Sequence, residues 1–239
     1  MSYRSALSHV LSSTIEPCAE QTSASERFPR ASVTALAEAG LLGLTVSPHL
    51  GGGGLGLVEA ADVVDRVSRA CPATGAVLRS HYAATACLEA YGTPWLRRKI
   101  AEGQHLSTLA LTDDGDSTAT RTGDVVALRA RKREVIGAGE ADSYLWSSRP
   151  DDGGARPALW LVPADAPGLF VPARPDGTGP RGSCAATVCA DPVLVPASAG
   201  LGREGGRNAG VLGTVLAWLA TLSAAGPEIA EPAGVEALA

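Results

Sequence analysis

The feature that most constrains the fold is a change of pattern near Gln104. Before it, apolar residues recur every three to four positions, which is the spacing of amphipathic helices. After it, apolar and β-branched residues alternate between dense glycines and prolines, which is typical of short antiparallel strands. The sequence therefore predicts an α+β protein. Residues 1–105 form an N-terminal helical domain, 106–200 a small antiparallel β domain, and 201–239 a linker, one helix and a tail.

Five helices are expected in the first domain. Their ranges are 3–26, 28–43, 57–69, 74–91 and 94–102. Four consecutive glycines, Gly51 to Gly54, interrupt them and require a loop. This loop lacks the Lys-Ser/Thr ending of a phosphate-binding loop, so no nucleotide is expected there.

The segment from Ser107 to Gly139 outlines a hairpin whose turn faces a ligand. Its approach strand ends at Thr112, a turn rich in Asp and Gly follows, and a second strand returns from Asp124 to Val135. A further solvated turn is expected over residues 150–156.

The last helix, expected over residues 208–225, is apolar around most of its circumference. Fully burying one large apolar side chain is worth roughly 1.5–3 kcal/mol, so this helix must be covered. Either the first two domains fold over it, or another chain does. Its large apolar residues are Val211, Leu212, Val215, Leu216, Trp218, Leu219 and Leu222.

Composition excludes several classes of function. A net charge of −5 with 4% aromatic residues argues against a nucleic-acid partner, which needs a basic surface and stacking rings. The 5 cysteines are scattered without a CxxC pair, so they indicate free thiols in a reducing compartment. Neither a leader nor a membrane-spanning apolar run is apparent, and a cytoplasmic protein without a membrane partner is expected.

Short strings spread from residue 28 to residue 226 occur in a characteristic order. They are Phe28-Pro29, Ala39 to Val46, the glycine run with Leu55-Gly56, Tyr91-Gly92-Thr93, Glu102-Gly103, Ala110-Leu111-Thr112, Gly182-Ser183, Val193 to Pro196 and Leu201-Gly202. Their order and spacing resemble the acyl-CoA dehydrogenase family.

The resemblance implies a flavin, FAD, lying against the β domain and an acyl thioester of CoA or a carrier protein bound between the domains. The implied reaction is α,β-dehydrogenation of the acyl group. Carried over residue by residue, the family motifs assign cofactor contacts to Leu111, Thr112, Gly115, Ser117 and Ile136. No metal site is implied.

The chain departs from the family pattern around this site. The family continues its threonine with glutamate, proline, glycine, a small residue, glycine, serine and aspartate, whereas this chain has a shorter segment beginning Asp113-Asp114-Gly115-Asp116-Ser117. Where the family sets tryptophan-isoleucine-threonine against the flavin ring, this chain has Glu134-Val135-Ile136. A carboxylate thus replaces the stacking ring, and an isoleucine replaces the hydroxyl.

The family's C-terminal helical bundle usually supplies the catalytic glutamate, and through a neighbouring subunit the adenine contacts. Only the first helix of that bundle is expected here. No carboxylate occurs between Asn208 and Ala225, and Leu219 occupies the alternative position of the base. Glu134 is left as a weak candidate acid or base. The simpler alternative is a solvent-facing strand residue paired with Arg131 or Arg133.

Other candidates have simpler explanations. The aspartates from Asp113 to Asp116 lack the spacing and closing Glu of a calcium loop, which favours a solvated turn. The basic run Arg129 to Arg133 suits a pyrophosphate or an acidic helix of a carrier protein, but such a run is more commonly an exposed strand edge protected against pairing. Ser183 is not part of the Gly-x-Ser-x-Gly motif that positions a nucleophilic serine. The histidines, His9, His49, His81 and His105, show no metal-ligand spacing.

Three functions therefore remain open. The first is flavin-dependent dehydrogenation of an acyl thioester, with a partner chain completing the site in a homo- or hetero-oligomer. The second is a non-redox reaction on the thioester, such as dehydration or isomerisation, using Glu134 or the aspartate loop. The third is a non-catalytic binding or assembly subunit.

Overall fold

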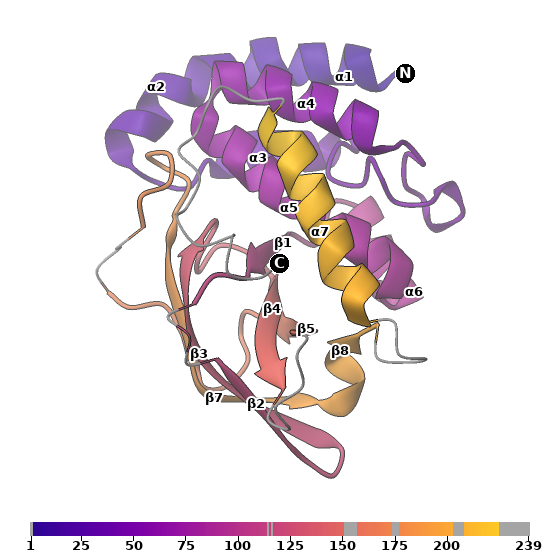
Figure 1. Cartoon of the computed structure of the whole chain (residues 1–239). Coiled ribbons are helices and arrows are strands. Elements are labelled where there is room, and N and C mark those ends of the chain that lie inside the picture. Colours follow the sequence, from indigo (N-terminus) through magenta and orange to yellow (C-terminus); the bar gives the residue numbers. More distant parts are fainter. Residues whose placement is uncertain are drawn as a thin grey trace.

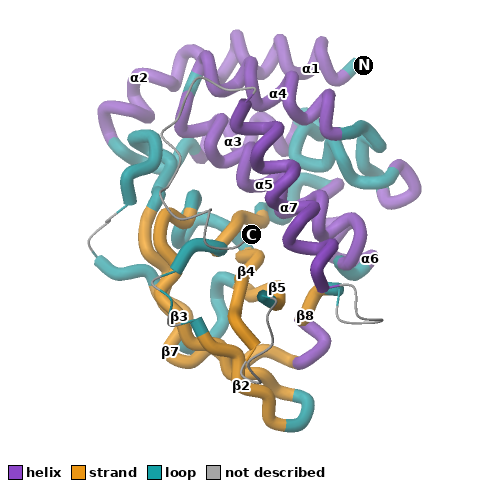
Figure 2. The backbone as a smooth tube through the Cα atoms, viewed as in Figure 1, coloured by secondary structure: helices purple, strands orange, loops and turns teal. Residues whose placement is uncertain are grey.

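The computed structural model describes residues 2–113, 115, 117–150, 157–173, 177–202 and 208–224. A helical layer lies over one end of a β layer, and the last helix crosses the front of both (Figure 1). Figure 2 shows the same division, with helices above and strands below. The predicted α+β fold class is confirmed.

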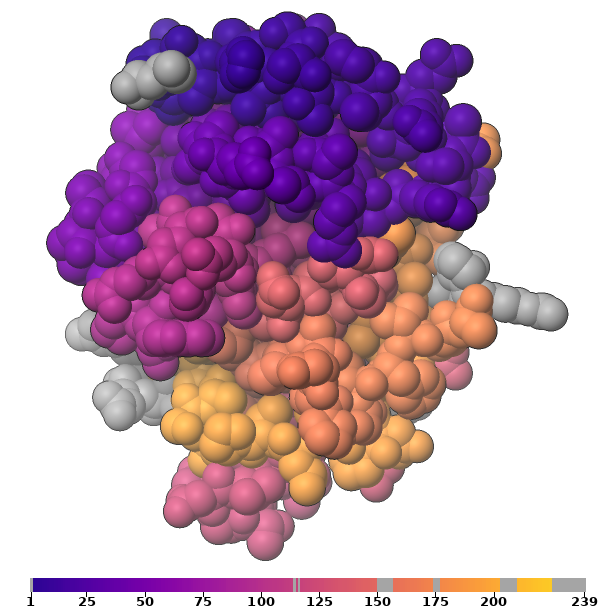
Figure 3. Space-filling view, turned by 180° about the vertical axis from the view of Figure 1, so that it is seen from behind, coloured from indigo at the N-terminus to yellow at the C-terminus, as the bar shows by residue number. Residues whose placement is uncertain are grey.

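The helices of the first layer occur at the predicted segments. They are α1 (Tyr3–Val10), the π-helical turn η1 (Leu11–Ile15), α2 (Glu16–Ser25), α3 (Arg30–Glu38), the 3-10 turn η2 (Pro48–Leu50), α4 (Leu57–Ala70), α5 (Pro72–Tyr91) and α6 (Pro94–Ala101). From behind, the N-terminal helices form the upper surface of the molecule (Figure 3).

The second predicted helix is shorter than expected. Gly40 adopts a left-handed φ of 73°, and the amide of Leu41 donates to the carbonyl of Leu36 at 2.9 Å. This reversal ends α3 and satisfies its last carbonyls. Leu41, Leu42 and Leu44 are then buried from a loop rather than from a helix.

Helix α5 is the centre of the molecule. It contacts α4, α7 and β1, and most of its residues are buried. Its polar side chains bind the backbone of neighbouring segments. Tyr82 donates to the Leu41 carbonyl at 2.7 Å, while the two ring nitrogens of His81 lie 3.1 Å from the Leu42 carbonyl and 3.2 Å from the Ser107 carbonyl.

The β layer is one mixed sheet with strand order β6-β7-β3-β2-β4-β5-β8, and β1 beside β4. Its elements are β1 (Ser107–Ala110), β2 (Thr118–Thr122), β3 (Val125–Val135), β4 (Ser143–Pro150), β5 (Ala158–Pro163), β6 (Leu169–Phe170), β7 (Ala186–Pro196), the 3-10 turn η3 (Ala197–Ala199) and β8 (Gly200–Leu201).

Two strand pairings differ from the antiparallel expectation. β4 pairs in parallel with both β1 and β2, and the hairpin partner of β3 is β2 rather than β1. All four residues of β1 are buried, so β1 needs cover on both faces. It therefore lies inside, between α5 and β4. Its extension meets β3 at a single antiparallel bridge between Asp113 and Lys132.

The last helix, α7 (Asn208–Ala224), packs against α5 and α4. Val211, Val215 and Leu222 are buried there, whereas Trp218 and Leu219 are only partly covered. The preceding domains thus cover one side of this helix. Of the turn predicted over 150–156, Pro150 ends β4 and residues 151–156 lie outside the described residues, as do most of the linker and the tail from 225.

Within the part of the chain that the structure describes, no helix combines the length and apolar character that a membrane crossing needs. All five cysteines are free thiols.

The contact between α4 and α5 depends on Gly75. A methyl group added there would lie 2.1 Å from the Ser68 Oγ and 2.7 Å from its Cα. We expect Gly75→Ala to lower the free energy of unfolding in urea by about 1–3 kcal/mol, because the two helices must separate. Gly213→Ala is the control, because nothing lies within 4 Å of that position in α7. It should be neutral or stabilise by up to about 1 kcal/mol. Equal effects would contradict the close packing.

Burial lowers the pKa of His81 to about 4, although its backbone partners at Leu42 and Ser107 favour protonation. The unfolded chain therefore binds a proton between about pH 6.5 and 4 that the folded chain does not. We expect stability to be complete above pH 6.5 and to fall by up to about 1.4 kcal/mol per pH unit in this window. An NMR titration should show one imidazole that stays neutral to about pH 4. An His81 resonance that titrates near 6.5 would be the contrary result.

Candidate functional site

A small cavity lies where α5, the end of β1, the end of β3 and α7 meet. Its volume is about 100 Å³. Leu111, Thr112, Glu134 and Ile136 all line it, so the fold brings together four of the residues singled out in the sequence. The remaining lining residues are Ala76, Arg79, Ser80, Leu109, Arg133, Leu216 and Leu219.

The wall formed by Leu111 and Thr112 is fixed by backbone hydrogen bonds. The amide of Leu109 donates to the Ser80 Oγ at 3.0 Å, which ties β1 to α5. The Thr112 carbonyl accepts from the amide of Arg133 at 2.9 Å, which ties the same segment to β3. Within the described residues the Thr112 hydroxyl makes no hydrogen bond, so it can serve a ligand.

Beneath this wall lies a buried ion pair. The Nζ of Lys132 is 2.5 Å from the Asp113 Oδ2, 2.8 Å from the Ser147 Oγ and 3.4 Å from the Leu111 carbonyl. The Lys132 side chain has 0% exposure, and its amine lies 5.6 Å from the Trp146 ring centre. The pair therefore connects the Leu111–Asp113 segment to β3 and β4.

The ion pair changes the pKa of both partners. Burial lowers the pKa of Lys132 to about 8, although the hydrogen bond and charge of Asp113 oppose the change. Burial alone would raise the pKa of Asp113, but the hydrogen bond and charge of Lys132 and the Gly115 amide lower it overall. Both groups are therefore charged at neutral pH.

Lys132 was missed in the sequence, where the run Arg129 to Arg133 was interpreted as an exposed edge. β3 lies between β7 and β2, so it is not an edge strand. Along β3 the exposed and buried positions alternate, and Lys132 falls on the buried side with Val126 and Leu128. This period-two pattern was the available signal.

Glu134 lies at an irregularity in β3. The register with β7 shifts between Lys132 and Val135, and Glu134 has a left-handed φ of 54°. Such a bulge turns a side chain away from the regular alternation. Both carboxylate oxygens accept from the Thr178 amide, at 3.1 and 2.9 Å, where the sequence suggested Arg131 or Arg133 as partners.

Two other predicted contacts lie away from the cavity lining. Gly115 is exposed with a φ of 95°, and its amide donates to the Asp113 Oδ1 at 2.9 Å in a tight turn. Ser117 is buried and donates to the Ser147 carbonyl at 3.2 Å. Asp114 and Asp116 lie outside the described residues.

The remaining polar candidates belong to other parts of the fold. His105 lies 2.8 Å from the Ser143 Oγ at the junction between α6 and β1. Ser183 is buried, and its hydroxyl has no hydrogen-bond partner among the described residues. In the described ranges, no group of three or more His, Cys, Asp or Glu side chains is placed to hold a metal ion.

Comparison with known proteins finds consistent matches. Residues 2–103 match the family model described as acyl-CoA dehydrogenase, N-terminal domain. The probable acyl-CoA dehydrogenase YngJ of Bacillus subtilis is 29% identical over 208 residues, which are 79% of this chain and 54% of the relative. The 3-sulfinopropanoyl-CoA desulfinase of Paraburkholderia xenovorans is 26% identical over 219 residues, or 85% and 56% of the two chains.

A solved structure described as the electron transferring flavoprotein of Acidaminococcus fermentans has the same fold. Its TM-score is 0.83 at 22% identity, with 93% of this chain and 62% of that chain covered. The chain thus spans about half of the length of the curated relatives it matches.

The buried ion pair gives a direct test of the site's framework. We expect Lys132→Met to lower the free energy of unfolding by about 3–5 kcal/mol, because it leaves the Asp113 carboxylate without its partner. The double variant Asp113→Asn/Lys132→Met removes that unpaired charge and should recover at least about 1 kcal/mol. Arg131→Met, one residue away on the exposed side of β3, is the control and should change stability by less than about 0.5 kcal/mol. If Lys132→Met and Arg131→Met lower the free energy of unfolding in urea by the same amount, the ion pair between Lys132 and Asp113 is contradicted.

Proposed function

Because the chain belongs to the acyl-CoA dehydrogenase family, we propose that it forms one part of a site that binds a flavin and an acyl thioester. The proposed reaction is the α,β-dehydrogenation of the acyl group, carried by CoA or by a carrier protein. The observation that carries this proposal is the cavity in which Leu111, Thr112 and Ile136 meet α5 and α7.

The residues of the cavity fit part of such a cofactor. Its volume of about 100 Å³ is below the roughly 300–1,000 Å³ of pockets that enclose a whole ligand. It therefore suits one edge of a flavin ring or the end of an acyl chain. Leu111 and Ile136 would contact an apolar ring face, and the Thr112 hydroxyl would supply a hydrogen bond. A bound flavin would supply the hydride acceptor.

We propose that a second subunit completes this site. Leu216, Trp218 and Leu219 of α7 are only partly covered by the described part of the chain, which leaves an apolar side for a neighbour. Helix α7 itself contains no carboxylate, so the base that removes the α-proton would come from that neighbour. The assembly would be a homo- or hetero-oligomer.

A cytoplasmic location belongs to the same proposal. The free thiols of all five cysteines support it, because oxidising compartments favour disulfides. Cys71, Cys87 and Cys189 are buried, as small apolar side chains in a reducing compartment commonly are.

A second candidate function is a non-redox reaction on the same thioester. It is favoured by the position of Glu134, which lines the cavity and whose carboxylate is oriented by the Thr178 amide. An oriented carboxylate within reach of a ligand can act as a general acid or base. One relative bears a name that describes desulfination of a CoA thioester rather than its dehydrogenation.

Flavin and thioester titrations test the proposal. We expect the purified protein to bind FAD with flavin absorption bands, and Leu219→Trp to weaken binding of FAD or of butyryl-CoA at least tenfold by filling the cavity. Ala217→Trp, at an exposed position of α7, is the matched control and should remain within twofold of the wild type.

The outcomes separate the candidates. A protein that stays colourless with excess FAD yet binds butyryl-CoA in a manner sensitive to Leu219→Trp would favour the non-redox reaction. If neither FAD nor butyryl-CoA binds to this chain, either alone or together with a subunit that contains the family's C-terminal helical bundle, both candidate functions are contradicted.

A further inference from the structure

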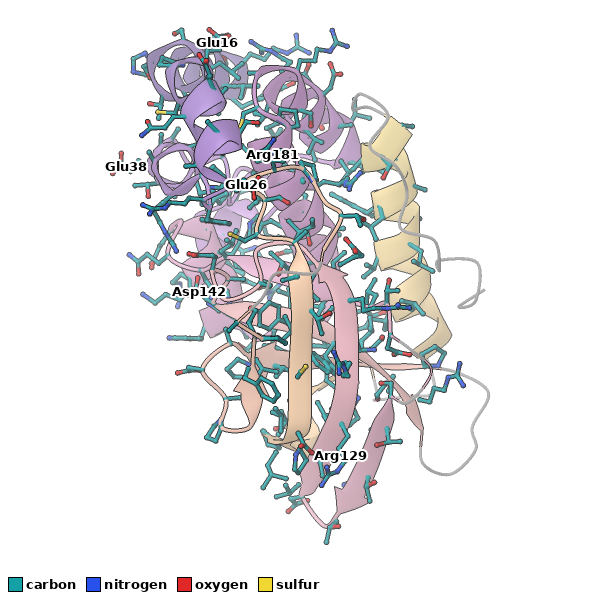
Figure 4. All side chains as sticks on the ribbon, turned by 90° about the vertical axis from the view of Figure 1, so that its left-hand side faces the viewer. Glu16, Glu26, Glu38, Arg129, Asp142 and Arg181 are labelled. Atoms are coloured by element: carbon teal, nitrogen blue, oxygen red, sulfur yellow. The ribbon has the colours of Figure 1, made fainter. Side chains whose placement is uncertain are left out.

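The outer face of the sheet formed by β2, β3, β7 and β6 carries an unusual set of side chains. Residues directly opposite each other on paired strands point to the same face. The register pairs Val125 with Pro196, Ala127 with Leu194, and Arg131 with Cys189, which in turn pairs with Phe170. These residues therefore share one surface, which we call the arginine face. Figure 4 shows β3 and β7 side by side, with Arg129 labelled near the lower end of β3.

Large apolar side chains are exposed on the arginine face. Val125 is 43% exposed, Leu194 61% and Phe170 52%, and they are three of the six large apolar residues exposed in the described part of the chain. Isolated exposed apolar residues are common, but several on one sheet face are a feature of interaction sites.

The same face displays a row of guanidinium groups. Arg129, Arg131 and Arg133 occupy alternate positions of β3 and are all exposed. Two residues of a strand span about 7 Å, so the row extends over roughly 14 Å. Arg129 is paired with Asp191 of β7, which offsets part of its charge. Arg131 adds an exposed positive charge beside this pair, within a chain whose net charge is −5.

The row leads to the cavity. Arg133 lies at its upper end and is also one of the residues that line the cavity between α5, β3 and α7. A partner bound over Arg129 and Arg131 would thus sit beside the mouth of the proposed thioester site. Arginine and aromatic residues together are enriched at protein–protein interfaces.

We propose that the arginine face docks an acidic acyl carrier protein, which delivers its thioester-linked acyl group into the cavity. This inference rests on the proposed function and identifies the carrier of its substrate. Acidic side chains of one carrier helix would meet Arg129 and Arg131, and apolar side chains of that helix would contact Leu194 and Phe170. Such a charge pattern favours encounter with an acidic partner and discriminates against basic ones.

The test compares a carrier protein with a free coenzyme. The probes are an acidic acyl carrier protein with its phosphopantetheine arm, the same carrier loaded with a butyryl group, and butyryl-CoA. We expect Arg131→Glu to weaken binding of both carrier forms at least tenfold, and Leu194→Ala to weaken it several-fold. Butyryl-CoA affinity should stay within twofold. Arg98→Glu is the matched control, because Arg98 is exposed on α6 and the substitution makes the same change of charge away from the arginine face. It should leave carrier binding within twofold.

Four results would overturn the docking proposal. The first is a wild type that does not bind the carrier, and the second is Arg98→Glu weakening carrier binding as much as Arg131→Glu does. The third is a loss of butyryl-CoA affinity in Arg131→Glu that parallels the loss of carrier affinity. The fourth is light scattering that shows Arg131→Glu dissociating a dimer of this chain. The parallel loss would mean that the face recognises phosphate groups of a cofactor. If the unloaded carrier binds through Arg131 but the butyryl group of the loaded carrier does not react, the docking site is supported and the proposed dehydrogenation is contradicted.

Discussion

The rest of the structure depends on the burial of α5. This helix is covered by α4, α7 and β1, and it has almost no side left for water. Three of its buried polar side chains bind the backbone of neighbouring segments: Tyr82 at Leu41, His81 at Leu42 and Ser107, and Ser80 at Leu109. Because unpaired polar groups are costly inside a protein, these bonds set how the sheet meets the helices. The cavity lies at that junction.

Strand β3 contributes to both the cavity and the arginine face, because its side chains alternate between the two faces of the sheet. Lys132 on the inner side holds the Asp113 carboxylate and so fixes the segment that carries Thr112. Arg129 and Arg131 on the outer side remain exposed. The bulge at Glu134 ends the alternation, and Glu134 becomes one of the residues that line the cavity. A shift of one residue in this register would exchange the two sides, so the site and the arginine face depend on the same pairing with β7.

The cavity is lined both by residues that match the family resemblance and by residues that depart from it. Leu111 and Thr112 are positioned by hydrogen bonds that tie their segment to α5 and to β3. The wall opposite them contains Glu134 and Ile136, in place of the stacking ring and hydroxyl that the family resemblance implies. A carboxylate next to a flavin edge would alter both the electrostatics and the shape of the proposed contact. The sequence matches support membership of the family, whereas the proposed reaction would depend on a ligand beside Glu134.

The sequence by itself determined the order of helices and strands, the α+β class and the family, because these follow from local periodicity and from strings of neighbouring residues. It also singled out Leu111, Thr112, Glu134 and Ile136. Only the tertiary structure decided that β1 pairs with β4 instead of β3, that Lys132 is buried, and that Gly115 and Ser117 lie away from the cavity lining. Strand partners and buried charges depend on contacts between residues distant in the chain. A β-strand pattern defines which side chains share a face, but not which neighbour covers that face.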